Sequence, residues 1–268
     1  MEPTSSTNWL EFPESGYLNV TEHTGQKLSR LILGLPVTNI LGTMDRDIRE
    51  IVYDSRKAGP DSLFVAVPGG TCDGGSFIKD AIAKGASAFI TQTPLDSLNG
   101  FDLGSRDVTA LSVEDSRKAL SIVSASFYRR PSERLALTGI TGTNGKTTTS
   151  YILEALLGAQ GVQTGVIGTI NYHFGDKKFS APVTTPESLD LNRILDAMIE
   201  EKIENCFLEV SSHALHQSRV HDMQFKVGIF TNLSRDHLDF HGDMESYKNA
   251  KKKLFLDNRV QQQIFNID

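Results

Sequence analysis

An apolar segment at residues 135–141 runs into Gly139-Ile-Thr-Gly-Thr-Asn-Gly-Lys-Thr-Thr148, and a helical pattern follows at residues 146–159. This order predicts a β-strand, a glycine-rich turn and an α-helix in succession. The N–H groups of such a turn and the N-terminus of the helix face the same point, which favours phosphate binding. We therefore predict an ATP or GTP site, with Lys146 at the terminal phosphates and Thr147 as a ligand of Mg²⁺.

Strand and helix patterns alternate on both sides of this turn. The expected strands are residues 62–67, 86–91, 164–170, 206–210 and 227–232, and the expected helices are residues 77–84, 113–128, 188–202 and 246–256. The alternation predicts an α/β fold. A polar connection at residues 129–133 divides it into a small first domain, residues 41–132, and a P-loop domain, residues 133–268. Residues 1–40 are expected to be a lead-in segment. Residues 263–268 enter a strand as the chain stops, so we expect the second domain to be incomplete.

Composition excludes several classes of protein. Among 268 residues, 27 are Lys or Arg and 33 are Asp or Glu, so the net charge of −6 creates no global field that attracts nucleic acid. No apolar run approaches the roughly 20 residues that span a bilayer. The first 16 residues lack the basic and apolar pattern of a secretory signal. Only Cys72 and Cys206 are present, which indicates buried thiols in a reducing cytoplasm rather than a disulfide framework.

Potential metal ligands are concentrated late in the chain. Five of the seven histidines fall close together, at positions 213, 216, 221, 237 and 241. Glu209 ends one apolar strand and His237 follows another, and the carboxyl ends of parallel strands meet at one edge of a sheet. This favours a Mg²⁺ site formed by Thr147, Glu209 and His237. A zinc hydrolase using His237 and His241 is the alternative, but the HExxH pattern is absent.

Two further segments have both a functional and an ordinary interpretation. The glycine-dense turn at residues 68–75 either brings backbone N–H groups to an anionic ligand or is a plain loop. The run Lys251-Lys-Lys253 is typical of a solvated helix face. Because successive helical side chains differ by about 100° in direction, one of the three can still point inward.

The motifs together resemble the Mur ligase family. The segment Thr141–Thr148 is similar to the ATP loop of that family, including Ile140, which stands where a strict P-loop pattern has a glycine. The other matching segments are Asp54-Ser-Arg56, Gly69–Gly75, Thr184-Thr-Pro-Glu187, Glu209-Val-Ser-Ser-His-Ala-Leu215, Gln217-Ser-Arg-Val220 and Thr231-Asn-Leu-Ser-Arg-Asp-His-Leu-Asp-Phe-His-Gly242. The resemblance runs from about residue 45 to the end of the chain.

The resemblance implies a cytoplasmic, monomeric, ATP-dependent ligase of peptidoglycan precursor synthesis. Such an enzyme adds the third amino acid, meso-diaminopimelate or L-lysine, to UDP-N-acetylmuramoyl-L-alanyl-D-glutamate through an acyl phosphate. It uses ATP and Mg²⁺ and has no nucleic-acid or membrane partner. The first domain is then a UDP-substrate-binding domain, and the second is the central ATP-binding domain.

The resemblance also implies roles for individual residues. The phosphates are held by Gly142, Thr143, Asn144, Gly145, Lys146, Thr147 and Thr148. Mg²⁺ is bound by Thr147, Glu209, His237 and a carbamylated Lys251, and the catalytic set is Lys146, His237 and Lys251. Substrate contacts are Ser55, Gly70, Thr71, Cys72, Thr184, Thr185, Ser211, Gln217 and Arg219. One departure is Val183, where several relatives have asparagine.

Length separates this chain from the family. Mur ligases have a third, C-terminal domain that closes over ATP and selects the amino acid, so we expect the chain alone to be inactive, whether as a fragment or as a natural truncation. The alternatives are a non-catalytic module that binds ATP or the UDP substrate, and a related ligase of the folylpolyglutamate or cyanophycin synthetase type.

Overall fold

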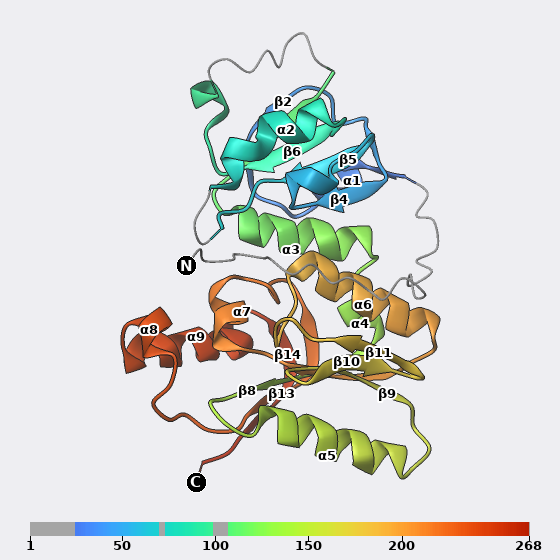
Figure 1. Ribbon diagram of the computed structural model, residues 1–268, viewed down its shortest axis with the longest axis vertical. Coiled ribbons are helices and arrows are strands. Elements are labelled where there is room, and N and C mark those ends of the chain that lie inside the picture. The colour runs from blue at the N-terminus through green and yellow to red at the C-terminus, as the bar shows by residue number, and fades with distance from the viewer. Residues whose placement is uncertain (1–24, 70–72, 99–106, 268) are drawn as a thin grey trace, which may run out of the picture.

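The computed structural model describes residues 25–69, 73–98 and 107–267. They form two α/β units, one above the other along the long axis of the molecule (Figure 1), and each unit has its own main sheet. This confirms the predicted fold class. Three of the expected substrate contacts, Gly70, Thr71 and Cys72, lie outside the described residues. Within the described ranges, no helix combines the length and the apolar character that a membrane span requires.

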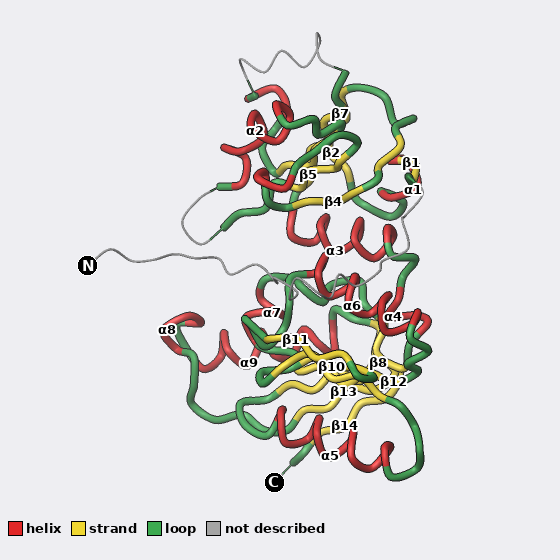
Figure 2. Tube along the Cα trace, turned by 45° about the vertical axis from the view of Figure 1, so that its right-hand side comes forward, coloured by secondary structure: helices red, strands yellow, loops and turns green. Residues whose placement is uncertain are grey.

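The N-terminal unit is built on a five-stranded sheet. Its strands, in spatial order, are β2 (Val37–Leu41), β7 (Thr109–Val113), β6 (Ala88–Thr91), β5 (Ser62–Val65) and β4 (Glu50–Val52). The strands β4 to β7 are parallel and β2 is antiparallel to β7. Helix α2 (Ile78–Ala83) covers one face and α3 (Ser116–Phe127) the other (Figure 2). Because a strand points alternate side chains to opposite faces, Leu63 packs on the α3 side and Phe64 on the α2 side.

The expected lead-in segment differs from the structure. From residue 25 onward it forms β1 (Gln26–Lys27), which pairs with β3 (Asp47–Ile48), and helix α1 (Leu28–Leu31). Leu28 and Leu31 are fully buried in the same core as α3. Three residues apart on a helix, these two side chains share one face, so this part of the chain belongs to the core of the N-terminal unit.

The C-terminal unit is built on a seven-stranded sheet. Its spatial order is β11 (Lys177–Ser180), β10 (Asn171–Phe174), β9 (Thr164–Ile167), β12 (Asn205–Glu209), β8 (Ala136–Thr141), β13 (Gln224–Phe230) and β14 (Arg259–Phe265). Five of these strands are parallel, and the β10–β11 hairpin extends one edge in antiparallel fashion. Strand β14 begins earlier than the strand expected at residues 263–268.

Helices cover both faces of the second sheet. Helix α5 (Lys146–Gly158) lies on one face, and α4 (Pro131–Arg134), α6 (Ser188–Glu200), α7 (Ser212–His216) and α9 (Met244–Leu256) lie on the other (Figure 1). The short α8 (Leu238–His241) precedes α9. The two units meet where α3 runs beside α6. There the Ser121 hydroxyl donates a hydrogen bond to the His221 carbonyl oxygen at 2.5 Å.

Candidate active site

The glycine-rich turn lies between β8 and α5, as predicted. Gly142 has a φ of +148°, and a Cβ atom built on it would lie 1.9 Å from Thr231 Oγ1, so only glycine fits. Gly145 precedes α5 in the left-handed conformation and, having no side chain, cannot cap that helix. Among the described residues, the first N–H groups of this 13-residue helix have no side-chain acceptor. A phosphate at this position would satisfy them.

The segment after β13 braces the turn. The Asn232 carbonyl oxygen accepts from the Thr143 N–H at 2.9 Å, and the Asn232 side-chain oxygen accepts from the Asn144 N–H at 3.0 Å. The Thr231 hydroxyl donates to the Asn144 carbonyl oxygen at 2.6 Å. On the other side, the Thr143 and Tyr247 hydroxyls are 3.1 Å apart. Sequence reasoning did not assign Asn232 or Tyr247 this role, although Asn232 lies in a segment that matched the family.

Two lysine amines share one acceptor beneath the turn. Lys146 Nζ and Lys251 Nζ both donate to the Gly142 carbonyl oxygen, at 2.9 and 2.7 Å, and Lys146 Nζ also donates to the Thr143 carbonyl oxygen. Lys251 is 3% exposed, whereas Lys252 is exposed. One lysine of the run therefore points inward. Burial, together with the charge of Lys146, lowers the pKa of Lys251 to about 7. Burial also lowers the pKa of Lys146.

A buried carboxylate faces the first turn of α5. Glu209, the last residue of β12, is fully buried and accepts from the Thr147 hydroxyl at 2.9 Å. It also accepts from the hydroxyl and the N–H of Thr169, at 3.0 and 3.1 Å. A Cβ atom on Gly168 would lie 2.1 Å from Glu209 Oε1, so the neighbouring turn needs glycine. The structure thus brings together two of the four expected metal ligands, Thr147 and Glu209, and adds Thr169, which the sequence did not reveal.

His237 lies apart from this pair. It adopts a left-handed conformation with φ of 52°, its side chain is 47% exposed, and its ring packs 5.0 Å from that of His213. In the described part of the chain, His237 forms no hydrogen bond with Thr147, Glu209 or Lys251. The same residues contain no cluster of three or more His, Cys, Asp or Glu arranged to hold a metal ion. The expected zinc alternative therefore has no support in the structure.

Four of the five late histidines pack against one another rather than around a metal site. Together with Phe240, the rings of His213, His216, His237 and His241 form an aromatic cluster on α7, α8 and the residue before α8. Burial lowers the pKa of His213 and His241, which favours their neutral forms. His221 lies at the contact between the two units, where its carbonyl oxygen accepts from Ser121.

The expected substrate contacts of the C-terminal unit gather beside Glu209. The Thr185 hydroxyl donates to the Glu209 carbonyl oxygen at 2.8 Å and accepts from the Ser211 N–H at 3.0 Å. The Thr184 hydroxyl lies 3.1 Å from that of Thr169. Arg219 Nη1 donates to the Thr185 carbonyl oxygen at 2.7 Å. These residues therefore form one connected group at the carboxyl ends of the strands.

Gln217 and Ser55 are the two remaining expected substrate contacts that the structure describes, and Val183 is the position that departs from the family pattern. The buried Gln217 Oε1 has no hydrogen-bond partner among the described residues. Ser55 is buried in the N-terminal unit after β4, and its carbonyl oxygen accepts from Lys84 Nζ at 3.1 Å. The carbonyl oxygen of Val183 accepts from the Tyr172 hydroxyl, while the valine side chain is exposed.

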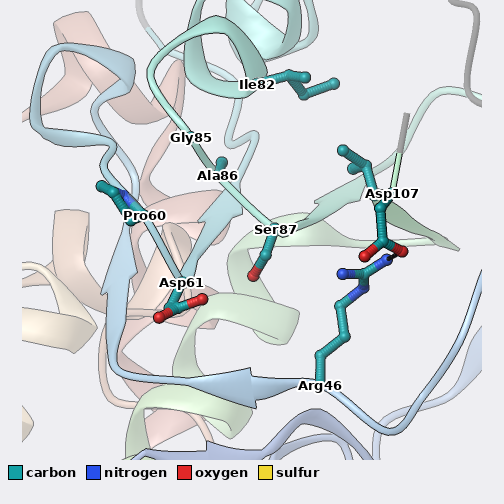
Figure 3. Close-up of a pocket in the computed structure, with 9 residues that line it drawn as sticks. Arg46, Pro60, Asp61, Ile82, Gly85, Ala86, Ser87 and Asp107 are labelled. Atoms are coloured by element: carbon teal, nitrogen blue, oxygen red, sulfur yellow. Dashed lines mark hydrogen bonds and ion pairs between the residues drawn. The ribbon is translucent and has the colours of Figure 1, made fainter. Parts of the chain in front are cut away.

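A separate hollow lies in the N-terminal unit, at the end of the sheet where its parallel strands begin (Figure 3). Its volume is about 440 Å³, and it lies at the residues that precede β5, β6 and β7. Arg46, in its wall, donates to Asp107 at 2.5 Å and to Thr109 at 2.6 Å. None of the predicted site residues that the structure describes lines this hollow.

The fold and the glycine-rich turn define an α/β protein with a loop of the phosphate-binding type. Comparison with known proteins identifies the family. The model of the Mur ligase middle domain matches residues 140–268, and that of the Mur ligase family catalytic domain matches residues 47–128. The chain belongs to the Mur ligase family.

The individual proteins that the chain resembles share the name of one type of Mur ligase. The chain is 44% identical over 241 residues to a UDP-N-acetylmuramoyl-L-alanyl-D-glutamate--2,6-diaminopimelate ligase of Alkaliphilus oremlandii, covering 90% of this chain and 48% of the relative. It is 46% identical over 235 residues to the ligase of the same name from Geobacillus kaustophilus, covering 87% and 46%. A solved structure of a ligase of that name aligns with a TM-score of 0.75 at 27% identity, covering 91% of this chain and 47% of that one. The chain spans about half the length of the curated relatives it matches.

Proposed function

We propose that this chain supplies the ATP-binding and UDP-substrate-binding parts of a ligase that adds 2,6-diaminopimelate to UDP-N-acetylmuramoyl-L-alanyl-D-glutamate. The observation that carries the proposal is the placement of Glu209 and Thr147 beside a turn that Lys146 and Lys251 both contact. We choose diaminopimelate because it is in the name shared by relatives that are 44–46% identical. L-Lysine is the other candidate.

The proposed reaction has two steps. The terminal phosphoryl group of ATP is transferred to the side-chain carboxylate of the D-glutamate, which gives an acyl phosphate and ADP. The amine of the incoming amino acid then attacks the acyl carbon, loses a proton and displaces phosphate, which leaves an amide. Chemistry of this kind depends mainly on positioning and on neutralising charge.

The residues of the turn suit the first step. The segment Gly142–Thr148 presents backbone N–H groups at the uncapped start of α5. Lys146 Nζ now donates to two carbonyl oxygens of the turn. A phosphate would offer it a stronger, charge-assisted acceptor. Lys146 would then neutralise the negative charge that the terminal phosphate carries during transfer.

The donor set also fits Mg²⁺, a hard ion that prefers oxygen ligands. Thr147 and Glu209 provide a hydroxyl and a carboxylate 2.9 Å apart, and we propose both as ligands together with His237. The ion, when bound, neutralises phosphate charge. We propose Lys251 as the fourth member, in its carbamylated form, because its amine is buried and its pKa is about 7. A carbamate there would replace a cation by an anion beside Lys146.

The second half of the proposal concerns the peptide nucleotide. We propose that Thr184, Thr185, Ser211 and Arg219 contact the dipeptide, because they form one group beside Glu209. Gln217 is proposed as a further contact, because its buried Oε1 has no hydrogen-bond partner among the described residues. Ser55 and residues 70–72 are proposed to lie at the UDP end. We further propose that the protein acts as a cytoplasmic monomer on small molecules. The net charge of −6 and the free, buried Cys206 are consistent with that setting.

Phosphate release from ATP and Mg²⁺ tests the proposal, with the UDP-muramoyl-dipeptide and either diaminopimelate or L-lysine supplied. Release that requires the dipeptide nucleotide and one of the amino acids supports the ligase and identifies its third residue. The second candidate function is binding of ATP and the UDP substrate without turnover. It predicts saturable binding of both nucleotides and no release. Binding of a folate substrate in place of the dipeptide nucleotide would contradict both.

A further inference from the structure

A polar contact crosses from the N-terminal unit into the group of proposed substrate residues. Arg117, in the first turn of α3, donates from Nη1 to Glu187 Oε2 at 3.2 Å. Its Nη2 donates to the carbonyl oxygen of Pro68 at 2.6 Å. Pro68 pairs with Asp73 across the glycine-rich turn of the N-terminal unit. One guanidinium therefore contacts both the turn proposed for the UDP end and the C-terminal unit.

Glu187 is shared between two arginines. Its Oε1 accepts from the Ser188 N–H at the start of α6, which fixes the carboxylate at a helix N-terminus. Its Oε2 faces both Arg117 Nη1 and, at 3.6 Å, Arg219 Nε. The Arg117, Glu187 and Arg219 side chains are only 19%, 16% and 19% exposed. Their mutual attraction is therefore screened less than that of surface ion pairs.

The charges of this trio do not cancel. Two guanidinium groups and one carboxylate leave one net positive charge, and Arg219 Nε has no hydrogen-bond partner in the described part of the chain. Arg219 also donates a hydrogen bond from Nη1 to the Thr185 carbonyl oxygen. The remaining charge suits one anionic group, such as the carboxylate of a peptide.

We propose that Arg117 is a positioning residue for the substrate site of the C-terminal unit, acting through Glu187 on Arg219. This inference rests on the proposed function. Arg117 draws Glu187 toward the N-terminal unit and so keeps Arg219 available for a carboxylate of the dipeptide. Without Arg117, Glu187 pairs fully with Arg219, and the substrate must compete with that carboxylate.

The test is calorimetric binding of the UDP-muramoyl-dipeptide to the full chain and to the variant Arg117→Met. Loss of a charge-assisted contact is worth about tenfold in affinity, and we expect the dipeptide nucleotide to bind that much more weakly. The β,γ-imido analogue of ATP with Mg²⁺ should bind within about twofold of the unchanged chain, because its site does not contact the trio. Arg117→Lys keeps the positive charge but not the two guanidinium nitrogens that reach separate acceptors, so it should recover part of the lost affinity.

Two further variants separate positioning from a merely structural role. Tyr53→Phe removes another hydrogen bond between the units, that of the Tyr53 hydroxyl with Asp190 Oδ2 at 2.6 Å, without touching Glu187. It should leave dipeptide affinity unchanged. Adding Glu187→Gln to Arg117→Met releases Arg219 and should restore affinity, whereas a structural role predicts further loss.

Three results would contradict the role proposed for Arg117. Unchanged affinity in Arg117→Met, an equal loss in Tyr53→Phe, or no recovery in the double variant would contradict it while leaving the proposed function intact. If the unchanged chain does not bind the dipeptide nucleotide at all, the proposed function fails and this inference fails with it.

Discussion

Lys146 and Lys251 donate to the same carbonyl oxygen, that of Gly142, although they are 105 positions apart in the chain. Two amines from different helices, α5 and α9, thus donate hydrogen bonds to the turn between β8 and α5. Burial disfavours the charged form of both amines, and the charge of Lys146 further disfavours that of Lys251. The pKa of Lys251 is about 7 as a result.

The depressed pKa of Lys251 predicts a pH dependence of stability. A lysine titrates near 10.5 when unfolded, so between about pH 7 and pH 10.5 the unfolded chain binds more protons than the folded one. The free energy of unfolding should therefore rise with pH across that window, relative to Lys251→Met. Urea unfolding at pH 7, 8 and 9 measures this. Lys252→Met, at an exposed position, is the control and should follow the unchanged chain.

Carbamylation of Lys251 predicts a labelled adduct. A buried amine that is largely neutral near pH 7 to 8 reacts with carbon dioxide, whereas an ammonium does not. With ¹³C-bicarbonate we expect a carbamate resonance that disappears in Lys251→Arg and persists in Lys252→Arg. A resonance that survives in Lys251→Arg would place the adduct elsewhere.

Gly142→Ala should abolish binding of ATP. The new Cβ would meet Thr231 Oγ1 at 1.9 Å, and the φ of +148° is a conformation that L side chains rarely adopt. Such strain costs about 1–3 kcal/mol of stability and displaces the turn. Gly158→Ala is a matched control at the end of α5, where a Cβ meets nothing within 4 Å. It should keep nucleotide binding and raise stability by about 0.5–1 kcal/mol. Thermal unfolding and calorimetry report both quantities.

Glu209→Gln should make nucleotide binding insensitive to Mg²⁺. The amide keeps the size of the side chain but removes the charge that a cation needs, and it leaves buried donors of Thr147 or Thr169 facing an NH₂ group. One unsatisfied buried group costs about 1–3 kcal/mol of stability. Titration of the ATP analogue with and without Mg²⁺ measures the change. An undiminished Mg²⁺ effect in the variant would exclude Glu209 as a ligand.

The sequence predicted the parts of the fold that have long, periodic patterns. Helices α5, α6 and α9 lie close to their expected ranges. Thr147 meets Glu209 as the strand order predicts, whereas His237, which was expected beside them, lies apart. Residues 109–113 were missed as a strand, and the expected helix began at residue 113. The reason is physical: a short strand that is buried on both faces has no alternation of apolar and polar residues that distinguishes it from a helix.

Other parts depend on contacts between distant segments. The sequence analysis assigned Leu28 and Leu31 to a lead-in segment, and only the position of α1 against α3 explains their burial. Thr169 and Asn232 reach the site from loops, and Arg117 reaches it from the other unit. None of these residues has a local pattern that signals its role, because chain topology alone brings it there.

Calorimetric titration of the 268-residue chain with UDP-N-acetylmuramoyl-L-alanyl-D-glutamate is the decisive measurement. We predict saturable binding at one site per chain, weakened when the D-glutamate is absent from the ligand and in Arg219→Met. No binding by the folded chain, or equal binding of UDP-N-acetylmuramic acid without its peptide, would contradict the proposed substrate.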